Sequence, residues 1–289
     1  MPELPEVETI VRDLNKKVLR RTFLDVWTDF KKLIKRPKNF EEFKKEIKKE
    51  KIERIWRRGK NILFNLSGEK TLLIHQKLTG HLLYGAWNME HGTWNPKIKG
   101  SLQEKVNTYI HLLFTFDNGQ QLALSDLRKF AKVELLNKKE LMEELKEIGP
   151  EPLEKDFTFE KFKKILQQTR GKIKQVLMDQ TVIAGIGNIY SDEILWQARI
   201  HPLRDVLKLN EKELNRIYQA MREILPKAIK LGGESISDFR RLSGQRGYFD
   251  KERKVYRREG EKCGRCGTII ERLKLAGRSA HFCPQCQKL

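Results

Sequence analysis

The pattern of apolar positions changes character along the chain. Near the N-terminus apolar side chains recur every three or four residues, which predicts an amphipathic helix over residues 3–19. From about residue 22 the pattern changes to short runs bounded by turn residues, typical of an antiparallel sandwich or barrel. We expect strands at Phe23–Trp27, Ile62–Leu66, Thr71–His75, His81–Tyr84, Tyr109–Phe116, Gln121–Ser125 and Lys132–Leu136.

The second half of the chain has a helical pattern. Gly149-Pro-Glu-Pro-Leu153 carries two prolines, which predicts an interdomain linker. After it, helical segments are expected near 158–168, 188–198 and 210–231. One stretch of the first half stands out, because residues 86–107 are polar and longer than a usual hairpin loop.

The composition favours a polyanionic partner. The 289 residues suffice for two domains and a small C-terminal module. The 59 Lys and Arg outnumber the 39 Asp and Glu, giving a net charge of +20, and nucleic acid is the first candidate for such a chain. An anionic membrane surface is the rival, but the positive charge is spread along the chain and no apolar run approaches the length of a membrane span. Part of the lysine can also be plain solubilising surface.

The four cysteines predict one metal site. They lie in the last part of the chain as Cys263-Gly-Arg-Cys266 and Cys283-Pro-Gln-Cys286. Two C-x2-C turns can close a tetrahedral four-thiolate shell around zinc, which is a structural arrangement because no position stays open. The alternative is two disulfides in a secreted protein, but no signal peptide precedes Pro2. His281 is a possible substitute ligand.

The N-terminus offers an unusual nucleophile. If Met1 is removed, Pro2 becomes a free secondary amine, which can attack an aldehyde or acetal carbon and form an electron-withdrawing iminium. A helix starting here should depress the pKa of the amine below about 8. Glu3 lies beside the amine and can move protons, and Glu6 follows one turn later. The alternative is a proline-started helix with stabilising acidic residues in its first turn.

Several motifs together resemble the formamidopyrimidine-DNA glycosylase family over nearly the whole chain. They are Pro-Glu-Leu-Pro-Glu-Val-Glu at 2–8, Arg-Arg-Gly-Lys at 57–60, Gly-Ile-Gly-Asn-Ile-Tyr-Ser-Asp-Glu at 185–193 and Ala-Gly-Arg-Ser-Ala-His-Phe-Cys at 276–283. The resemblance implies an α+β multidomain fold. Its expected parts are an N-terminal helix with an antiparallel β-sandwich at 2–148, a helix–two-turns–helix domain at 149–260, and a C-terminal β-hairpin zinc finger with four cysteine ligands at 261–289.

The resemblance also implies an activity and a partner. Members of the family excise oxidised purines, such as 8-oxoguanine and formamidopyrimidines, and cleave the strand by β- and δ-elimination. The resemblance implies that Pro2 attacks C1′ of the damaged nucleotide. We therefore expect a monomeric bacterial cytoplasmic enzyme that acts on double-stranded DNA with damaged bases or abasic sites, holds one structural zinc and has no membrane partner. An endonuclease VIII-like enzyme for oxidised pyrimidines and a non-catalytic DNA-binding module are the alternatives.

Specific residues inherit roles from the resemblance. Pro2, Glu3, Glu6 and Lys60 are expected at the catalytic centre, and Lys60 is expected to reach a phosphate flanking the lesion. Asn188, in the position of an N-cap, and Arg278 are expected to bind phosphates near the flipped nucleotide. His75 and Lys174 resemble further DNA-contacting positions. The bland alternatives are a solvated hairpin charge at Lys60 and an ordinary cap at Asn188.

The sequence departs from the family pattern where the DNA is wedged open. Leu78 replaces the usual Met, whereas Arg128 and Phe130 are kept in a loop that lacks the usual Pro, second Arg and Gly. Ser235–Phe249, which resembles the loop covering an extruded 8-oxoguanine, carries Arg246 where Pro is common. Residues 86–107 bear Trp87 and Trp94, which are expected to stack on DNA, to cover an edge strand or to form a surface loop.

Overall fold

The computed structural model describes residues 1–235 and 238–289. They form two compact units, one made of Met1–Lys146 with Leu231–Asp250 and the other of Glu147–Lys230 with Lys251–Leu289. The division into domains at 2–148, 149–260 and 261–289 stays a prediction. The compact units differ from it because residues 231–250 pack with the N-terminal part of the chain.

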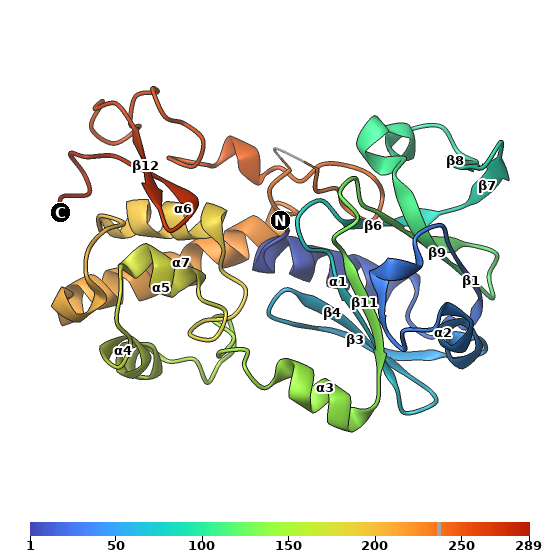
Figure 1. Ribbon diagram of the computed structural model, residues 1–289. Helices are drawn as coiled ribbons and strands as arrows, with labels where there is room; N and C mark the ends of the chain where they lie inside the picture. The colour runs from blue at the N-terminus through green and yellow to red at the C-terminus, as the bar shows by residue number, and fades with distance from the viewer. Residues whose placement is uncertain (236–237) are drawn as a thin grey trace. The chain divides into compact units, whose positions relative to one another are not determined.

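The first unit is a β-sandwich with a helix packed into its core (Figure 1). One sheet has the order β1 (Phe23–Thr28), β9 (Ile110–Phe116), β10 (Gln121–Ser125), β6 (His81–Gly85). The other has the order β2 (Ile34–Arg36), β11 (Lys132–Leu136), β5 (Thr71–His75), β4 (Asn61–Leu66), β3 (Ile52–Arg58). Helix α1 (Leu4–Lys17) shares one apolar cluster with both sheets through residues such as Val7, Phe64 and Phe114. The predicted helix and sandwich are therefore confirmed.

One strand pair differs from the predicted antiparallel pattern. Strand β2 runs parallel to β11, with Ile34 opposite Val133 and Arg36 opposite Glu134. A three-residue strand at the sheet edge follows the 3-10 turn Lys31–Leu33. So short an element has too little alternation to reveal its direction in the sequence.

All the strands expected from the sequence are present, but others were missed. Strand β3 carries mostly charged, partly exposed side chains because it lies at the edge of its sheet, where charges prevent pairing with other molecules.

The helices α2 (Phe40–Ile47) and α3 (Lys138–Leu145) begin at the N-cap residues Asn39 and Asn137, whose side chains accept hydrogen bonds from backbone N–H groups.

The insertion 86–107 packs on the sandwich. It forms the hairpin β7 (Trp87–Glu90) and β8 (Thr93–Pro96), followed by the 3-10 turns Ser101–Gln103 and Lys105–Asn107. Trp87 is only 3 % exposed and joins Leu83 and Leu113 in an apolar cluster on the four-stranded sheet. Base stacking by Trp87 is therefore excluded in this structure, because its ring serves as a core side chain. Trp94 packs edge-on against Trp27 at 5.3 Å between ring centroids.

The second unit contains four α-helices and a hairpin. The helices are α4 (Phe159–Gln167), α5 (Ile173–Met178), α6 (Asn188–Ala198) and α7 (Glu211–Lys230), and α6 contacts α5, α7 and the hairpin. The helices expected near 158–168, 188–198 and 210–231 are thus confirmed. The hairpin joins β12 (Glu271–Leu275) to β13 (Arg278–Phe282) through Ala276 and Gly277, which both have positive φ, as a two-residue hairpin turn requires. Among the described residues, no helix combines the length and apolarity needed to cross a membrane.

Candidate functional site

Pro2 lies just outside the first helix. Helix α1 begins at Leu4 with Glu3 as its N-cap, and Pro5 occupies the first turn. The helix predicted over residues 3–19 therefore begins at Leu4, with Pro5 in its first turn. Pro2 and Glu3 are both buried. The first turn thus has the proline and the acidic residue of the purely structural alternative, while Pro2 itself lies outside the helix.

Glu6 holds this N-terminal turn in place. Its Oε2 accepts a hydrogen bond from the backbone N–H of Glu3 at 2.8 Å, and its Oε1 accepts one from the N–H of Glu234, also at 2.8 Å. The side chain is 1 % exposed. Two amide donors satisfy a buried carboxylate and fix its position. Glu6 therefore fixes the position of the N-terminal turn, while a catalytic part for it stays a prediction.

The terminal amine lies in an environment that favours its neutral form. In the chain that retains Met1, burial lowers the pKa of the amine, and the Lys60 ammonium lowers it further, whereas Glu3, Glu6 and Asp238 oppose the shift. The direction agrees with the expectation, but burial is the main physical cause. A neutral amine is the form that can attack carbon.

Lys60 and His75 border the same centre. Lys60 lies in the turn between β3 and β4 and is 6 % exposed, which excludes a solvated hairpin charge. Burial lowers the pKa of His75 to about 3, with Lys77, Lys60 and Lys132 adding to the effect. His75 Nδ1 accepts the Lys77 N–H at 2.9 Å, so the neutral ring carries its proton on Nε2 and offers a donor there.

The structure brings together the segments that hold Leu78, the expected wedge, and Arg128 with Phe130, the residues expected beside it. Strand β5 ends at His75 opposite Lys132 of β11, and β6 begins at His81 opposite Ser125 of β10. The connection that holds Leu78 therefore runs beside the loop 126–131 that holds Arg128 and Phe130. This proximity follows from strand register and was not visible in the sequence.

A buried carboxylate joins these two connections. Asp126 is fully buried, and its Oδ1 accepts hydrogen bonds from the Thr79 hydroxyl and from the Arg128 N–H. Its Oδ2 accepts the Ala131 N–H at 2.7 Å. Thr79 and Asp126 are positioning residues that the sequence analysis missed, since neither is exposed or part of a recognised charge pattern.

The side chains these loops present are suited to unstacked bases. Phe130 is 50 % exposed, and the Arg128 guanidinium lies 4.7 Å from the centroid of its ring. Leu127, which the sequence analysis did not single out, is also 50 % exposed, and Leu78 is half-buried. Exposed apolar and aromatic side chains next to an arginine can wedge into a base stack and contact the base left behind.

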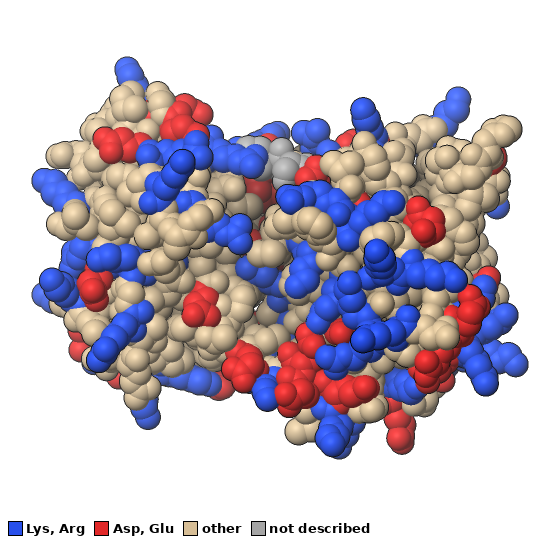
Figure 2. All heavy atoms as spheres, in the orientation of Figure 1, with Lys and Arg blue, Asp and Glu red and all other residues tan. Residues whose placement is uncertain are grey.

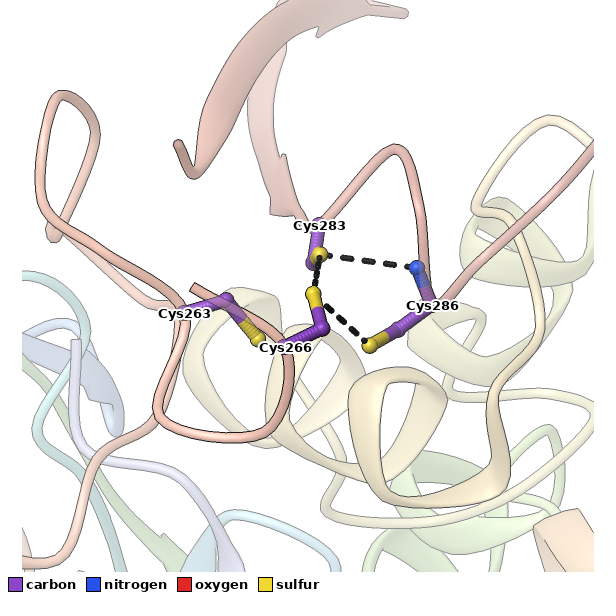
Figure 3. Close-up of side chains that lie close together, drawn as sticks. All are labelled: Cys263, Cys266, Cys283 and Cys286. Atoms are coloured by element: carbon purple, nitrogen blue, oxygen red, sulfur yellow. Dashed lines mark hydrogen bonds between the residues drawn. The ribbon is translucent and has the colours of Figure 1, made fainter. Parts of the chain in front are cut away.

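In the second unit the four cysteines fit one structural zinc (Figure 3). Their sulfur atoms all lie within 4.8 Å of one another, and the Cys266 sulfur is 3.4 Å from those of Cys283 and Cys286. Tetrahedral Zn–S bonds of about 2.3 Å require sulfur separations of about 3.8 Å, so the set matches one ion. All four are free thiols rather than disulfides.

His281 is not part of the four-sulfur cluster, and both of its ring nitrogens lie near carboxylates, with Nε2 3.5 Å from Glu259 Oε2. Its backbone N–H and its Nδ1 both lie at hydrogen-bond distance from Asp192 Oδ2, at 3.0 and 2.9 Å. Asp192, in α6, also pairs through Oδ1 with the Lys174 ammonium. One buried carboxylate thus ties β13 and α5 to α6, a role for Asp192 that the sequence analysis did not foresee.

The proposed phosphate-binding residues of this unit differ in accessibility. Arg278 is exposed at the start of β13 and lines a pocket of about 300 Å³ together with Lys174. Lys174 is 1 % exposed, because Asp192 holds its ammonium. Asn188 is the first helical residue of α6 and Gly187 is the N-cap, which corrects the capping role expected of Asn188. DNA contacts of these residues stay predictions.

The surface carries the charge expected of a nucleic-acid-binding protein. Figure 2 shows Lys and Arg side chains spread over the visible face, with Asp and Glu in smaller groups. This distribution agrees with the net charge of +20 and with the spread of basic residues along the sequence. Such a surface attracts a polyanion over a long range.

Comparison with known proteins identifies the family. Residues 1–133 match the formamidopyrimidine-DNA glycosylase N-terminal domain, 148–240 its H2TH domain, and 260–289 a zinc finger found in FPG and IleRS. A formamidopyrimidine-DNA glycosylase of Pelotomaculum thermopropionicum is 40 % identical over 291 residues, covering 100 % of both chains.

Solved structures agree with the sequence relatives. The complex between the Lactococcus lactis Fpg and an abasic-site-containing DNA is 37 % identical, with a TM-score of 0.87, covering 99 % of this chain and 100 % of that one. The L. lactis G226P variant bound to Fapy-dG-containing DNA is 36 % identical with the same TM-score, covering 100 % of both chains. The chain therefore belongs to the formamidopyrimidine-DNA glycosylase family.

Proposed function

We propose that this protein is a bifunctional base-excision repair enzyme that removes oxidised purines from duplex DNA and cleaves the strand at the resulting abasic site. The observation that carries the proposal is the buried N-terminal turn. In it Pro2 directly precedes Glu3, the N-cap of α1, and the Glu6 carboxylate accepts a hydrogen bond from the Glu3 N–H. The L. lactis relatives bound to Fapy-dG and to abasic DNA support the choice of substrate. The enzyme acts on DNA in the bacterial cytoplasm.

The proposed reaction begins after removal of Met1. The lone pair of the Pro2 nitrogen forms a bond to C1′, and the glycosidic bond breaks as the base leaves with a proton. Opening of the sugar ring gives an iminium, which withdraws electrons so that a proton is lost from C2′ and the 3′ phosphate departs by β-elimination. A second elimination releases the 5′ phosphate, and water then hydrolyses the remaining iminium, which breaks the bond between C1′ and the Pro2 nitrogen and frees the sugar remnant as an aldehyde. Glu3, next to the amine, transfers protons in these steps.

Borohydride trapping tests the proposal. Reduction during turnover on duplexes with 8-oxoguanine, a formamidopyrimidine or an oxidised pyrimidine should trap a covalent protein–DNA adduct, most strongly for the purine lesions. Mass spectrometry of the adduct should place the DNA on the N-terminal peptide at Pro2. Fully active enzyme that retains Met1 would contradict the mechanism, and preference for the oxidised pyrimidine would move the protein to an endonuclease VIII-like specificity.

Lys60 and Arg278 are proposed to bind phosphates. Lys60→Ala and Arg278→Ala should each weaken DNA binding and reduce the slope of log K against log salt by about one unit, because each lost contact releases one counterion fewer. Fluorescence anisotropy over a salt series measures both quantities. Lys45→Ala, which removes an exposed lysine of α2, is the charge-matched control. An unchanged slope in a variant would place that residue off the phosphate path.

Leu78 is proposed as the wedge. Leu78→Ala should lower excision from duplex DNA about tenfold while sparing cleavage of a single-stranded abasic site, because only the duplex must be unstacked. Arg128→Ala should instead flatten the preference among opposite bases. Leu207→Ala, at an exposed leucine of the 3-10 turn Val206–Lys208, is the control. Equal activity of Leu78→Ala and the parent on both substrates would mean that another side chain forms the wedge.

A further inference from the structure

The end of the insertion contacts a loop that follows it by more than a hundred residues. We call residues 101–107 the insertion turn and residues 238–249 the return loop. Asn107, in the insertion turn, is fully buried. Its Nδ2 donates to the carbonyl oxygens of Ser101 (2.7 Å) and Gly244 (3.3 Å), and its Oδ1 accepts from His81 Nε2 (2.8 Å). Because every polar atom of the amide has a partner, its orientation is fixed.

An ion pair makes the second connection. Glu104 Oε2 lies 2.9 Å from Nε of Arg240, whose side chain is only 4 % exposed. A guanidinium at such depth requires anionic or carbonyl partners. Arg240 also donates to the Phe239 carbonyl oxygen at 2.8 Å, and the insertion turn supplies a carboxylate to it through Glu104.

The two segments also fit closely in shape. Gly244 has a φ of +80°, and a Cβ added there would lie 2.9 Å from the Ser101 carbonyl carbon and 3.0 Å from the Leu102 nitrogen. These backbone atoms cannot move aside like the end of a flexible side chain. The return loop and the insertion turn therefore touch backbone to backbone, and only glycine allows this approach.

The chain leading into the return loop borders the reaction centre. The Glu234 N–H donates to Glu6 Oε1, and a Cβ on Gly233 would lie 2.8 Å from the same oxygen. The return loop lies against this segment, because the Phe249 N–H donates to the Gly233 carbonyl oxygen at 3.1 Å and the Gly247 N–H donates to Ser235 Oγ at 2.8 Å. Asp238 and Arg240 also act on the His81 ring. The return loop thus contacts the insertion turn on one side and, on the other, the segment 233–235 that holds Glu6.

We propose that Glu104 and Asn107 are positioning residues that hold the return loop beside the N-terminal amine and thereby set the rate of base excision. The proposal rests on the function proposed above. A base leaving C1′ must lie near the amine that attacks C1′, so a segment bordering the amine adjoins the base. An abasic site has no base, and its cleavage depends less on where this segment lies.

Glu104→Ala tests the proposal because Glu104 is 40 % exposed at its side chain, so its loss removes the carboxylate from Arg240 without opening a cavity in the apolar core. We expect kcat/KM for excision of an oxidised purine to fall about tenfold, whereas cleavage of an abasic site in the same duplex stays near the parent value. Glu104→Gln, which keeps an acceptor for Arg240, should retain intermediate excision. Gly244→Ala, which forces the two backbones apart, should reproduce the selective loss.

Glu90→Ala is the matched control, since Glu90 is an exposed glutamate of the same insertion, and it should leave both activities unchanged. Thermal unfolding of every variant separates a change in stability from a change in rate. Equal losses on both substrates, or unchanged excision in Glu104→Ala, would overturn the proposal. A parent protein that neither excises an oxidised purine nor forms a trapped adduct would instead refute the proposed function itself.

Discussion

Replacement of Glu3 by glutamine is expected to reduce base excision at least about a hundredfold, within the range that proton transfer by a positioned carboxyl contributes. Glutamine has the same size but cannot exchange a proton. Glu3 is 2 % exposed beside Pro2 and caps α1, so the substitution changes the chemistry with little change in packing. Single-turnover excision of an oxidised purine measures the effect.

The same Glu3→Gln variant should keep more activity on a preformed abasic site, because no base has to leave. Glu8→Gln is the matched control in the same helix. Glu8 pairs with the exposed Arg12 and with the largely buried Arg57, and its replacement by the equally sized glutamine should affect neither substrate strongly. If Glu3→Gln lost both activities equally, Glu3 would serve the N-terminal amine in general and not the departure of the base.

Removal of zinc is expected to abolish binding to lesion-containing DNA. Cys263 and Cys283 belong to the apolar cluster of Trp196, Val255 and Ile270, and Cys283 directly follows β13. Since the free energy of zinc binding is also folding free energy for a small module, the hairpin that presents Arg278 should unfold without the ion. The chemistry of the N-terminal amine is not itself removed.

Metal analysis should find about one zinc per chain, and Cys266→Ser should lose it, since three thiolates leave the shell open. Gln285→Ala, at an exposed position between two of the ligands, should keep both the metal and DNA binding. Readdition of zinc to chelated parent protein should restore binding. Full excision by protein verified to be free of zinc would contradict the link between the metal and DNA engagement.

The residues brought together by strand register show where sequence reasoning ended. The loops around Leu78 and Arg128 were each recognised, but their junction at Thr79 and Asp126 joins residues 47 positions apart. Glu6 was expected at the catalytic centre, and its partner Glu234 lies 228 positions away. Lys174 was expected to contact DNA, and its ammonium forms an ion pair with the Asp192 carboxylate of another helix. Contacts between residues so far apart in the chain produce no periodic pattern of apolar and polar positions, so the sequence does not predict them.

By itself the sequence determined the features that local interactions decide. Helical and strand periodicities, the proline-containing linker and the C-x2-C spacing each depend on residues within a few positions of one another, and the helix α1, the strands of the sandwich and the four-sulfur cluster all agree with the prediction. Only the tertiary structure decided burial and partnership. It turned Trp87 into a core side chain, gave Glu6 two backbone donors and placed the insertion turn on the return loop, because these depend on surfaces that meet only after the chain has folded.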